Sequence, residues 1–141
     1  MVTLVIGLPG SGKTEYVRDH LGIDGIAYDM DYIAKALRLG TMINPDSRFV
    51  ANAISHGFYR YASEYCSDVY IIRIAPRLDD VESMHPDRII YCSVNNPQVK
   101  IKNRDRETYI RHINDVINYA KQNNIRVIEH NNPPLPGENV E

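Results

Sequence analysis

The fold of this chain is decided by its first stretch, which reads Val2-Thr3-Leu4-Val5-Ile6-Gly7-Leu8-Pro9-Gly10-Ser11-Gly12-Lys13-Thr14. Five β-branched or aliphatic residues lead into a glycine-rich turn, and a helical pattern follows from Lys13 to Leu21. This order of strand, loop and helix is the setting in which G-x-x-x-x-G-K-[ST] forms a phosphate-binding loop. Gly7, Gly12, Lys13 and Thr14 match that motif in full. The stretch therefore predicts such a loop.

The loop carries the groups that a nucleoside triphosphate such as ATP needs. Its glycines allow main-chain conformations that turn the amides inward, and Pro9, which has no N–H, stiffens the turn. We expect Lys13 to reach the β- and γ-phosphates and the Thr14 hydroxyl to ligate Mg²⁺. The alternative is a glycine-rich turn without a ligand. The expected main-chain donors are Gly10, Ser11, Gly12, Lys13 and Thr14.

Five short apolar runs predict the strands of a parallel sheet. Four of them are almost continuously apolar, which is the pattern of strands covered on both faces. Helical patterns separate the runs, and no hairpin turn joins consecutive strands. The predicted fold class is therefore α/β, a three-layer sandwich in which helices cover both faces of a five-stranded parallel sheet. The runs are Val2–Ile6, Ile26–Tyr28, Val69–Ile74, Arg88–Cys92 and Ile125–Ile128.

The longest helical pattern, from Asp46 to Tyr65, predicts which face of that helix is buried. Apolar residues recur there at three- and four-residue steps, and Asp46 or Ser47 can cap the start. Arg48 falls on the polar face, which either contacts a substrate or is plain surface. Other helices are expected at 13–21, at 32–39, after Pro76 and at 107–122. The residues expected to face inward are Phe49, Val50, Ile54, Phe58, Tyr61 and Tyr65.

Size and composition fit one domain, expected over residues 1–130, with a Pro-rich tail over residues 131–141. The chain has 141 residues, of which 43% are hydrophobic and 24% charged, as in ordinary globular proteins. Its net charge of -2 argues against a protein that coats nucleic acid or lies on a membrane. No apolar run is long enough to cross a bilayer, and the start does not read as a signal peptide. Cys66 and Cys92 are expected to be reduced thiols, so the expected location is cytoplasmic.

Two aspartates follow the second predicted strand. Asp29 and Asp31 are two residues apart where the strand ends, so their side chains face different directions and can take different roles. One can accept a proton from an attacking hydroxyl, and the other can order the water shell of Mg²⁺. We favour Asp29 as the base and Asp31 as the helix cap or metal partner. The alternative is that one or both only cap the following helix.

A wider resemblance rests on the glycine loop and on the run Asp29-Met30-Asp31-Tyr32-Ile33-Ala34-Lys35-Ala36-Leu37. A phosphate-binding loop followed by a strand that ends in Asp-x-Asp resembles the P-loop kinase group, which includes nucleotide kinases and phage polynucleotide 5′-kinases. The run is also similar to the "DxDxIAxAL" run of small AAA-type ATP-binding proteins of phages. The resemblance implies ATP, Mg²⁺ and an aspartate, Asp29 or Asp31, that activates an acceptor hydroxyl. The arginine that often follows this aspartate is missing, since the first one here is Arg38.

Four arginines are candidates for phosphate contacts. The third predicted strand leads to Ala75-Pro76-Arg77, which resembles the G-[FY]-P-R segment of nucleoside monophosphate kinases. That resemblance implies that Arg77 holds substrate phosphate, and Arg73 is a second candidate for this role. In such kinases a short lid, here expected around residues 102–106, supplies arginines to the transferred phosphoryl group, which points to Arg104 and Arg106. For each arginine the alternative is a solvated surface residue.

These features predict an ATP- and Mg²⁺-dependent phosphotransferase whose acceptor is a nucleoside, a nucleotide or a nucleic-acid 5′ end. The third strand does not end in the acid found in typical ATPases, so a carboxylate for the metal has to come from Asp29 or Asp31. The missing acid also favours a second hypothesis, a catalytically weak nucleotide-binding module that acts through a protein partner. A small DNA-linked ATPase is a third. The acceptor, the choice between ATP and GTP, and the oligomeric state stay open.

Overall fold

The computed structural model describes residues 1–94 and 100–132. Strands and helices alternate along most of the chain, as the apolar patterns predict. The strands are β1 (Val2–Ile6), β2 (Gly25–Asp29), β3 (Asp68–Ile72), β4 (Arg88–Val94) and β5 (Arg126–Asn132). The helices are α1 (Lys13–His20), α2 (Met30–Ala36), α3 (Pro45–Tyr65), α4 (Leu78–Met84) and α5 (Asn103–Gln122).

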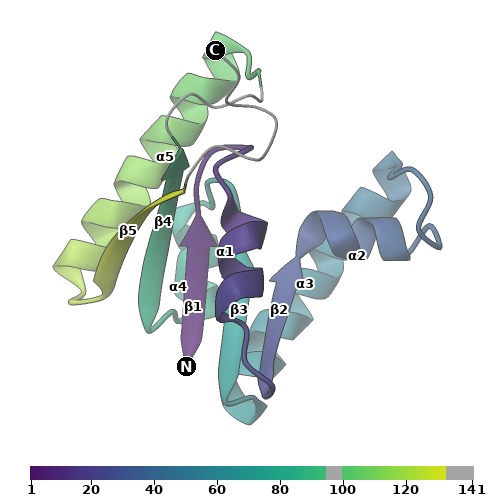
Figure 1. Cartoon of the computed structure of the whole chain (residues 1–141), viewed down its shortest axis with the longest axis horizontal. Coiled ribbons are helices and arrows are strands. Elements are labelled where there is room, and N and C mark those ends of the chain that lie inside the picture. Colours follow the sequence, from purple (N-terminus) through teal and green to yellow (C-terminus); the bar gives the residue numbers. More distant parts are fainter. Residues whose placement is uncertain (95–99, 133–141) are drawn as a thin grey trace.

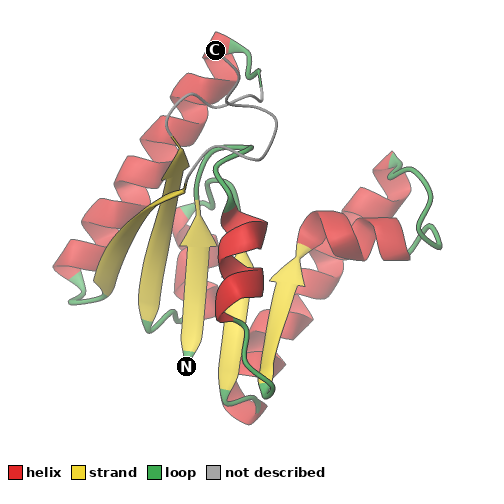
Figure 2. Cartoon of the chain, in the orientation of Figure 1, coloured by secondary structure: helices red, strands yellow, loops and turns green. Residues whose placement is uncertain are grey.

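The described strands form a five-stranded parallel sheet in the order β2-β3-β1-β4-β5, seen in Figure 1 and, coloured by structure, in Figure 2. β1 lies at the centre and is buried along its whole length, which explains its continuously apolar sequence. The predicted fold class is confirmed. Because all strands run in the same direction, the segments that follow β1, β2 and β3 start from the same edge of the sheet, where ligands of such folds bind.

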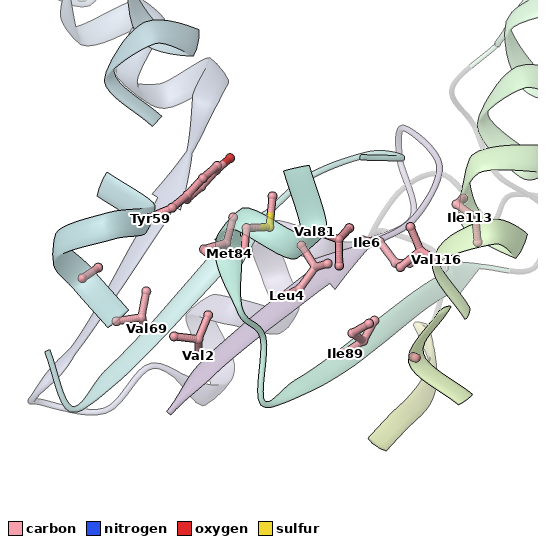
Figure 3. Packing of buried hydrophobic residues seen from close by; sticks show 13 residues of the cluster. Val2, Leu4, Ile6, Tyr59, Val69, Val81, Met84, Ile89, Ile113 and Val116 are labelled. Carbon is pink, nitrogen blue, oxygen red and sulfur yellow. The ribbon is translucent and has the colours of Figure 1, made fainter. Parts of the chain in front are cut away.

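Helices cover both faces of the sheet, and each face has its own core. α1 covers one face, where Tyr16 and Val17 pack among residues of β1, β3 and β4. α3, α4 and α5 cover the other face, and Figure 3 shows the larger core beneath them, with Met84 of α4 near Leu4 of β1 and Val116 of α5 near Ile6 of β1. α2 extends outward beside β2 and packs against α3 (Figure 1). Among these described helices, none has both the length and the apolar character that crossing a membrane requires.

The long helix α3 turns a different face to the core from the one predicted. Phe49 is 73% exposed and Tyr65 is 76% exposed, and Val50, Ile54 and Tyr61 are exposed as well. Of the six residues expected inside, Phe58 alone is partly buried against the core. The periodicity correctly predicted a helix, but the prediction of its inner face was wrong. The residues that α3 buries are mostly small or polar: Ser47, Ala51, Ser55, Tyr59 and Ala62.

The start of α3 also differs from the prediction, because its cap is Asn44 and not Asp46 or Ser47. Asn44 Oδ1 accepts a hydrogen bond from the Ser47 N–H at 2.8 Å, and Ser47 Oγ accepts one from the Asn44 N–H at 3.1 Å. Pro45 occupies the first helical position, where a missing N–H costs nothing. The two hydrogen bonds between Asn44 and Ser47 therefore fix the main chain where the segment after α2 leads into α3.

The last helix and the last strand differ from their predicted bounds. β5 continues through Asn131 and Asn132, which the prediction assigned to the tail, so the strand carries the sheet to residue 132. α5 begins at Asn103, so the expected lid around residues 102–106 forms the first turn of this helix. The rest of the predicted tail, residues 133–141, lies outside the described residues, as do residues 95–99.

Candidate functional site

The loop between β1 and α1 lies so close to its surroundings that two of its glycines have no room for a side chain. Gly12 has a φ of 85°, in the left-handed region that favours glycine. A carbon added at Gly12 would lie 2.7 Å from Cγ of Asn132. A carbon added at Gly7 would collide with Oγ of Ser11 and with the carbonyl oxygen of Cys92. The two fixed glycines of the motif are therefore required by close contacts as well as by main-chain conformation.

Main-chain hydrogen bonds hold this loop in a curved form. The Gly7 N–H donates to the Ile74 carbonyl at 3.1 Å, and the Ser11 N–H donates to the Leu8 carbonyl at 3.1 Å. The Ser11 amide, expected to bind phosphate, is thus used inside the loop in this conformation. Oγ of Ser11 is buried and has no hydrogen-bond partner among the described residues. The loop therefore retains a polar group that the described part of the chain leaves unsatisfied.

Lys13 extends back over the loop. Its Nζ donates to the carbonyl oxygens of Gly7 and Leu8, each at 2.9 Å. Burial lowers the pKa of Lys13, and the nearby Cys92 thiol and Asp29 carboxylate act in the opposite direction. A phosphate oxygen is a stronger partner for an ammonium than a neutral carbonyl is. The position thus suits the predicted role of Lys13, which is to reach the β- and γ-phosphates.

Thr14 and the two aspartates meet where α1 begins and β2 ends. The Thr14 hydroxyl donates to Asp29 Oδ2 at 3.2 Å, and the Asp31 N–H donates to Asp29 Oδ1 at 3.0 Å. Asp29 is therefore the cap of α2, whereas the sequence favoured Asp31 as the cap or metal partner and left open that one or both aspartates cap this helix. Asp31 forms an ion pair with Arg48 of α3 at 3.6 Å, and both side chains are more than 60% exposed. The structure thus gives both oxygens of Asp29 a structural partner and leaves Asp31 near solvent.

The oxygen atoms of this corner fit a magnesium ion. Mg²⁺ prefers hard oxygen ligands and is usually held by a few protein oxygens together with substrate phosphates and waters. Thr14 supplies a hydroxyl next to Asp29, and Asp31 lines the same pocket. Over residues 1–94 and 100–132 there is no group of three or more acidic, histidine or cysteine side chains that could hold a metal by itself. Thr14, Asp29 and Asp31 are the residues that would hold Mg²⁺ at this corner, together with phosphate oxygens and waters.

These residues line one open pocket of about 430 Å³ at the carboxyl edge of the sheet. Arg73, a predicted substrate contact, is part of its wall and is held by the Tyr59 hydroxyl at 2.9 Å and by Asp80 at 3.2 Å. Arg48 and Tyr109 also line it, and the motifs did not single out either as a site residue. The complete lining is Pro9, Gly10, Lys13, Thr14, Asp29, Met30, Asp31, Arg48, Ile72, Arg73, Ile74, Ala75 and Tyr109.

Three predicted arginines do not line this pocket. Arg77 lies in a separate groove between α4 and α5, together with His112 and Asp115. Arg104 and Arg106 belong to the first turn of α5, and Arg104 is 88% exposed beside Asp105. Tyr109, one helical turn after Arg106, is the residue of α5 that reaches the pocket. The one feature of the sequence that could have pointed to Tyr109 is its position three residues after the candidate Arg106.

Comparison with known proteins identifies the fold but no relative in sequence. No family model matches the chain, and no curated protein matches it. A chain of the structure described as the Pnkp1/Rnl/Hen1 RNA repair complex matches with a TM-score of 0.56 and 13% identity, over 86% of this chain and 45% of that one. This chain therefore spans less than half of that neighbour. A sugar kinase from Janibacter sp. HTCC2649 matches with a TM-score of 0.41 and 15% identity, over 94% of this chain and 87% of that one. The first likeness shows a shared fold, which agrees with the α/β sandwich predicted from the alternation of apolar runs and helical patterns.

Proposed function

We propose that this protein is an ATP- and Mg²⁺-dependent phosphotransferase that moves the γ-phosphoryl group to a hydroxyl or phosphate acceptor. One observation carries the proposal. The phosphate loop with Lys13 and Thr14, and the carboxylates of Asp29 and Asp31, line the same pocket at the carboxyl edge of the sheet. A nucleotide-binding turn without chemistry would not need two carboxylates beside the terminal phosphate. We assign the acceptor to the side of this pocket that is lined by Arg48 of α3 and Tyr109 of α5.

The residues then take distinct roles in the transfer. Lys13 and the loop amides bind the β- and γ-phosphates, and Thr14 with Asp29 holds the metal ion, which supplies positive charge to the phosphates. For a hydroxyl acceptor, Asp31 takes the proton as the acceptor oxygen bonds to the γ-phosphorus and the bond to the β–γ bridging oxygen breaks, releasing ADP. We assign the base to Asp31 because both oxygens of Asp29 already accept hydrogen bonds. This reverses the preference that the sequence suggested.

Two arginines, Arg48 and Arg73, line the pocket and can contact an acceptor. Arg73 has part of its charge balanced by Asp80, whereas Arg48 is paired only loosely with Asp31 across 3.6 Å. An acceptor phosphate can therefore draw Arg48 away from Asp31 and free that carboxylate to act as a base. A chain of an RNA repair complex has the same fold, which makes nucleic-acid 5′ ends a reasonable acceptor class to include in a test.

Transfer of labelled phosphate from γ-labelled ATP tests the proposal. The acceptor panel consists of nucleosides, nucleoside monophosphates and 5′-hydroxyl oligonucleotides, each assayed with Mg²⁺ and with excess chelator. We expect a labelled product with at least one acceptor, dependent on Mg²⁺ and abolished by Lys13→Met. Tight ATP binding without any labelled product across the panel would contradict the proposal.

A second candidate is a nucleotide-binding module with little activity that acts through a protein partner. It is favoured by the end of β3, where Ile72 is followed by Arg73 and not by an acid. A partner-dependent signal that survives both Asp29→Ala and Asp31→Ala would support this candidate over the enzyme.

A further inference from the structure

A side chain from the far edge of the sheet reaches the phosphate loop. Asn132, the last residue of β5, donates from Nδ2 to the main-chain carbonyl oxygen of Ser11 at 2.7 Å. The two residues are 121 positions apart in the chain. The same side chain lies against the α-carbon of Gly12, where an added carbon would come within 2.7 Å of it. Asn132 therefore contacts the loop at the point where it turns into α1.

The hydrogen bond from Asn132 to the Ser11 carbonyl also controls the direction of the Gly12 N–H, which belongs to the same peptide unit. The Ser11 carbonyl and the Gly12 N–H belong to one planar trans peptide unit, so they point in opposite directions. Holding the Ser11 oxygen toward Asn132 of β5 therefore holds the Gly12 N–H in the direction away from β5. Because Gly12 has left-handed backbone, this unit has no regular secondary structure to fix it. The bond from Asn132 supplies the missing constraint.

The Asn132 side chain has two further partners, His130 on its own strand and Cys92 on β4. A main-chain carbonyl only accepts, so the amino group of Asn132 has to face Ser11, and Oδ1 faces His130 Nε2 at 3.0 Å. Nε2 of His130 must then carry the hydrogen. The His130 ring is held edge-on to Tyr16 of α1, with 4.8 Å between ring centres, and Tyr16 stacks on His20 at 3.9 Å. Two elements that flank the loop, α1 and β5, thus position one amide group.

We propose that Asn132 is a positioning residue for phosphate binding, and that His130 acts through it by orienting its side-chain amide. The inference rests on the proposed function, since it concerns the same phosphate loop. It adds a requirement that the loop motif does not contain: full affinity for a polyphosphate depends on a hydrogen bond from outside the motif. No contact between Asn132 and the base of the nucleotide is needed.

Titration calorimetry with two probes, Mg²⁺-ATP and Mg²⁺-tripolyphosphate, tests this role. Tripolyphosphate has no base, so it separates an effect on the phosphate donors from recognition of adenine. The variants are Asn132→Leu, which keeps the size but donates nothing, His130→Phe, which keeps the ring but not the Nε2 hydrogen, and the double variant. Glu129→Ala, an exposed position on the same strand, is the matched control. Circular dichroism confirms that each variant folds.

We expect Asn132→Leu to weaken both probes by the same factor, about 2- to 13-fold, which is the range for losing one neutral hydrogen bond. His130→Phe should weaken both probes by a smaller factor, and the double variant should bind no more weakly than Asn132→Leu alone, since both changes act through one amide. Glu129→Ala should bind as the wild type does.

Two results overturn the inference while leaving the proposed function intact: unchanged binding by Asn132→Leu, or a loss for Mg²⁺-ATP without one for Mg²⁺-tripolyphosphate. Additive losses from Asn132→Leu and His130→Phe would remove His130 from the proposal. If Asn132→Leu does not fold, unchanged binding by His130→Phe overturns the proposal instead. A wild-type protein that binds neither probe would overturn the inference and the proposed function together.

Discussion

The Thr14 hydroxyl donates a hydrogen bond to Asp29 across 3.2 Å, which joins the first turn of α1 to the end of β2. β2 lies at an edge of the sheet, separated from β1 by β3. Since β3 ends without an acid, the carboxylate nearest to the expected metal ligand Thr14 comes from this edge strand. The relationship separates the two aspartates, because Asp29 contacts Thr14 and Asp31 contacts Arg48.

Substitution of the two aspartates should therefore affect different steps, metal binding for Asp29 and phosphoryl transfer for Asp31. We expect Asp29→Asn to raise the concentration of Mg²⁺ required for half-maximal activity by about tenfold or more, as is common when a group that orients a metal ligand is changed. Asp31→Asn should leave the affinity for Mg²⁺-ATP within about twofold and lower kcat by about 10²- to 10⁴-fold, the usual contribution of a general base. Magnesium titrations of the transfer rate measure both effects. Equal Mg²⁺ requirements in the two variants would contradict this division of roles.

Binding of Mg²⁺-ATP should be coupled to proton uptake at alkaline pH. Burial lowers the pKa of Lys13 in the free protein, and bound phosphates would raise it again. The amine is charged in both states below the lowered pKa, so affinity is complete there and falls as the pH rises through that pKa. Calorimetry in buffers of different ionisation enthalpy measures the protons taken up. Uptake that persists in Lys13→Met would assign the effect to another group.

Arg48 and Arg106 provide a test of where the acceptor lies. Arg48 lines the pocket and is 62% exposed, so Arg48→Ala should raise KM for a phosphorylated acceptor by no more than about fivefold, the scale of a solvent-screened ion pair. Arg106→Ala should leave this KM within about twofold, because Arg106 does not line the pocket. A larger effect at Arg106 than at Arg48 would restore the lid predicted from the sequence.

The face that α3 buries can be checked by stability. Tyr59 is 2% exposed and its hydroxyl accepts a hydrogen bond from Arg73, so Tyr59→Ala should lower the free energy of unfolding by about 3–5 kcal/mol. Phe49→Ala, on the same helix but 73% exposed, should change it by less than about 0.5 kcal/mol. Urea denaturation of the two variants gives both numbers. A larger loss of stability for Phe49→Ala than for Tyr59→Ala would indicate that α3 buries the face predicted from its apolar periodicity.

Local features of the sequence were sufficient for the fold. β1 was predicted at its observed bounds because a central strand is apolar throughout, and α1 because a glycine loop ends where its helix begins. The face of α3 could not be predicted in this way. Periodicity reports that apolar residues share one side of a helix, whereas the face that packs depends on how closely neighbouring elements approach. Ala51, Ser55 and Ala62 are the small side chains that the close approach requires.

In the candidate site, too, residues marked by a local sequence pattern could be predicted, and residues that depend on distant contacts could not. The residues of the glycine loop could be singled out by a contiguous motif, and Asp29 by its place at the end of an apolar run, because both signals lie within short stretches of the sequence. Arg77 was misplaced because the direction of a side chain after a strand depends on the following turn, and α4 carries it toward α5. Asn132 was missed because its partner is Ser11, and no short pattern joins the end of the last strand to a loop at the start of the chain.

The most direct test of the central claim is a calorimetric comparison of the wild type and Lys13→Met with Mg²⁺-ATP. The wild type should bind one equivalent, and Lys13→Met should bind at least about tenfold more weakly, because a charge-assisted hydrogen bond contributes about 1.5–3 kcal/mol. Glu129→Ala, at an exposed site on β5, should bind as the wild type does. Equal binding by the wild type and Lys13→Met, or no heat with any nucleotide, would contradict the account that the glycine loop holds a triphosphate.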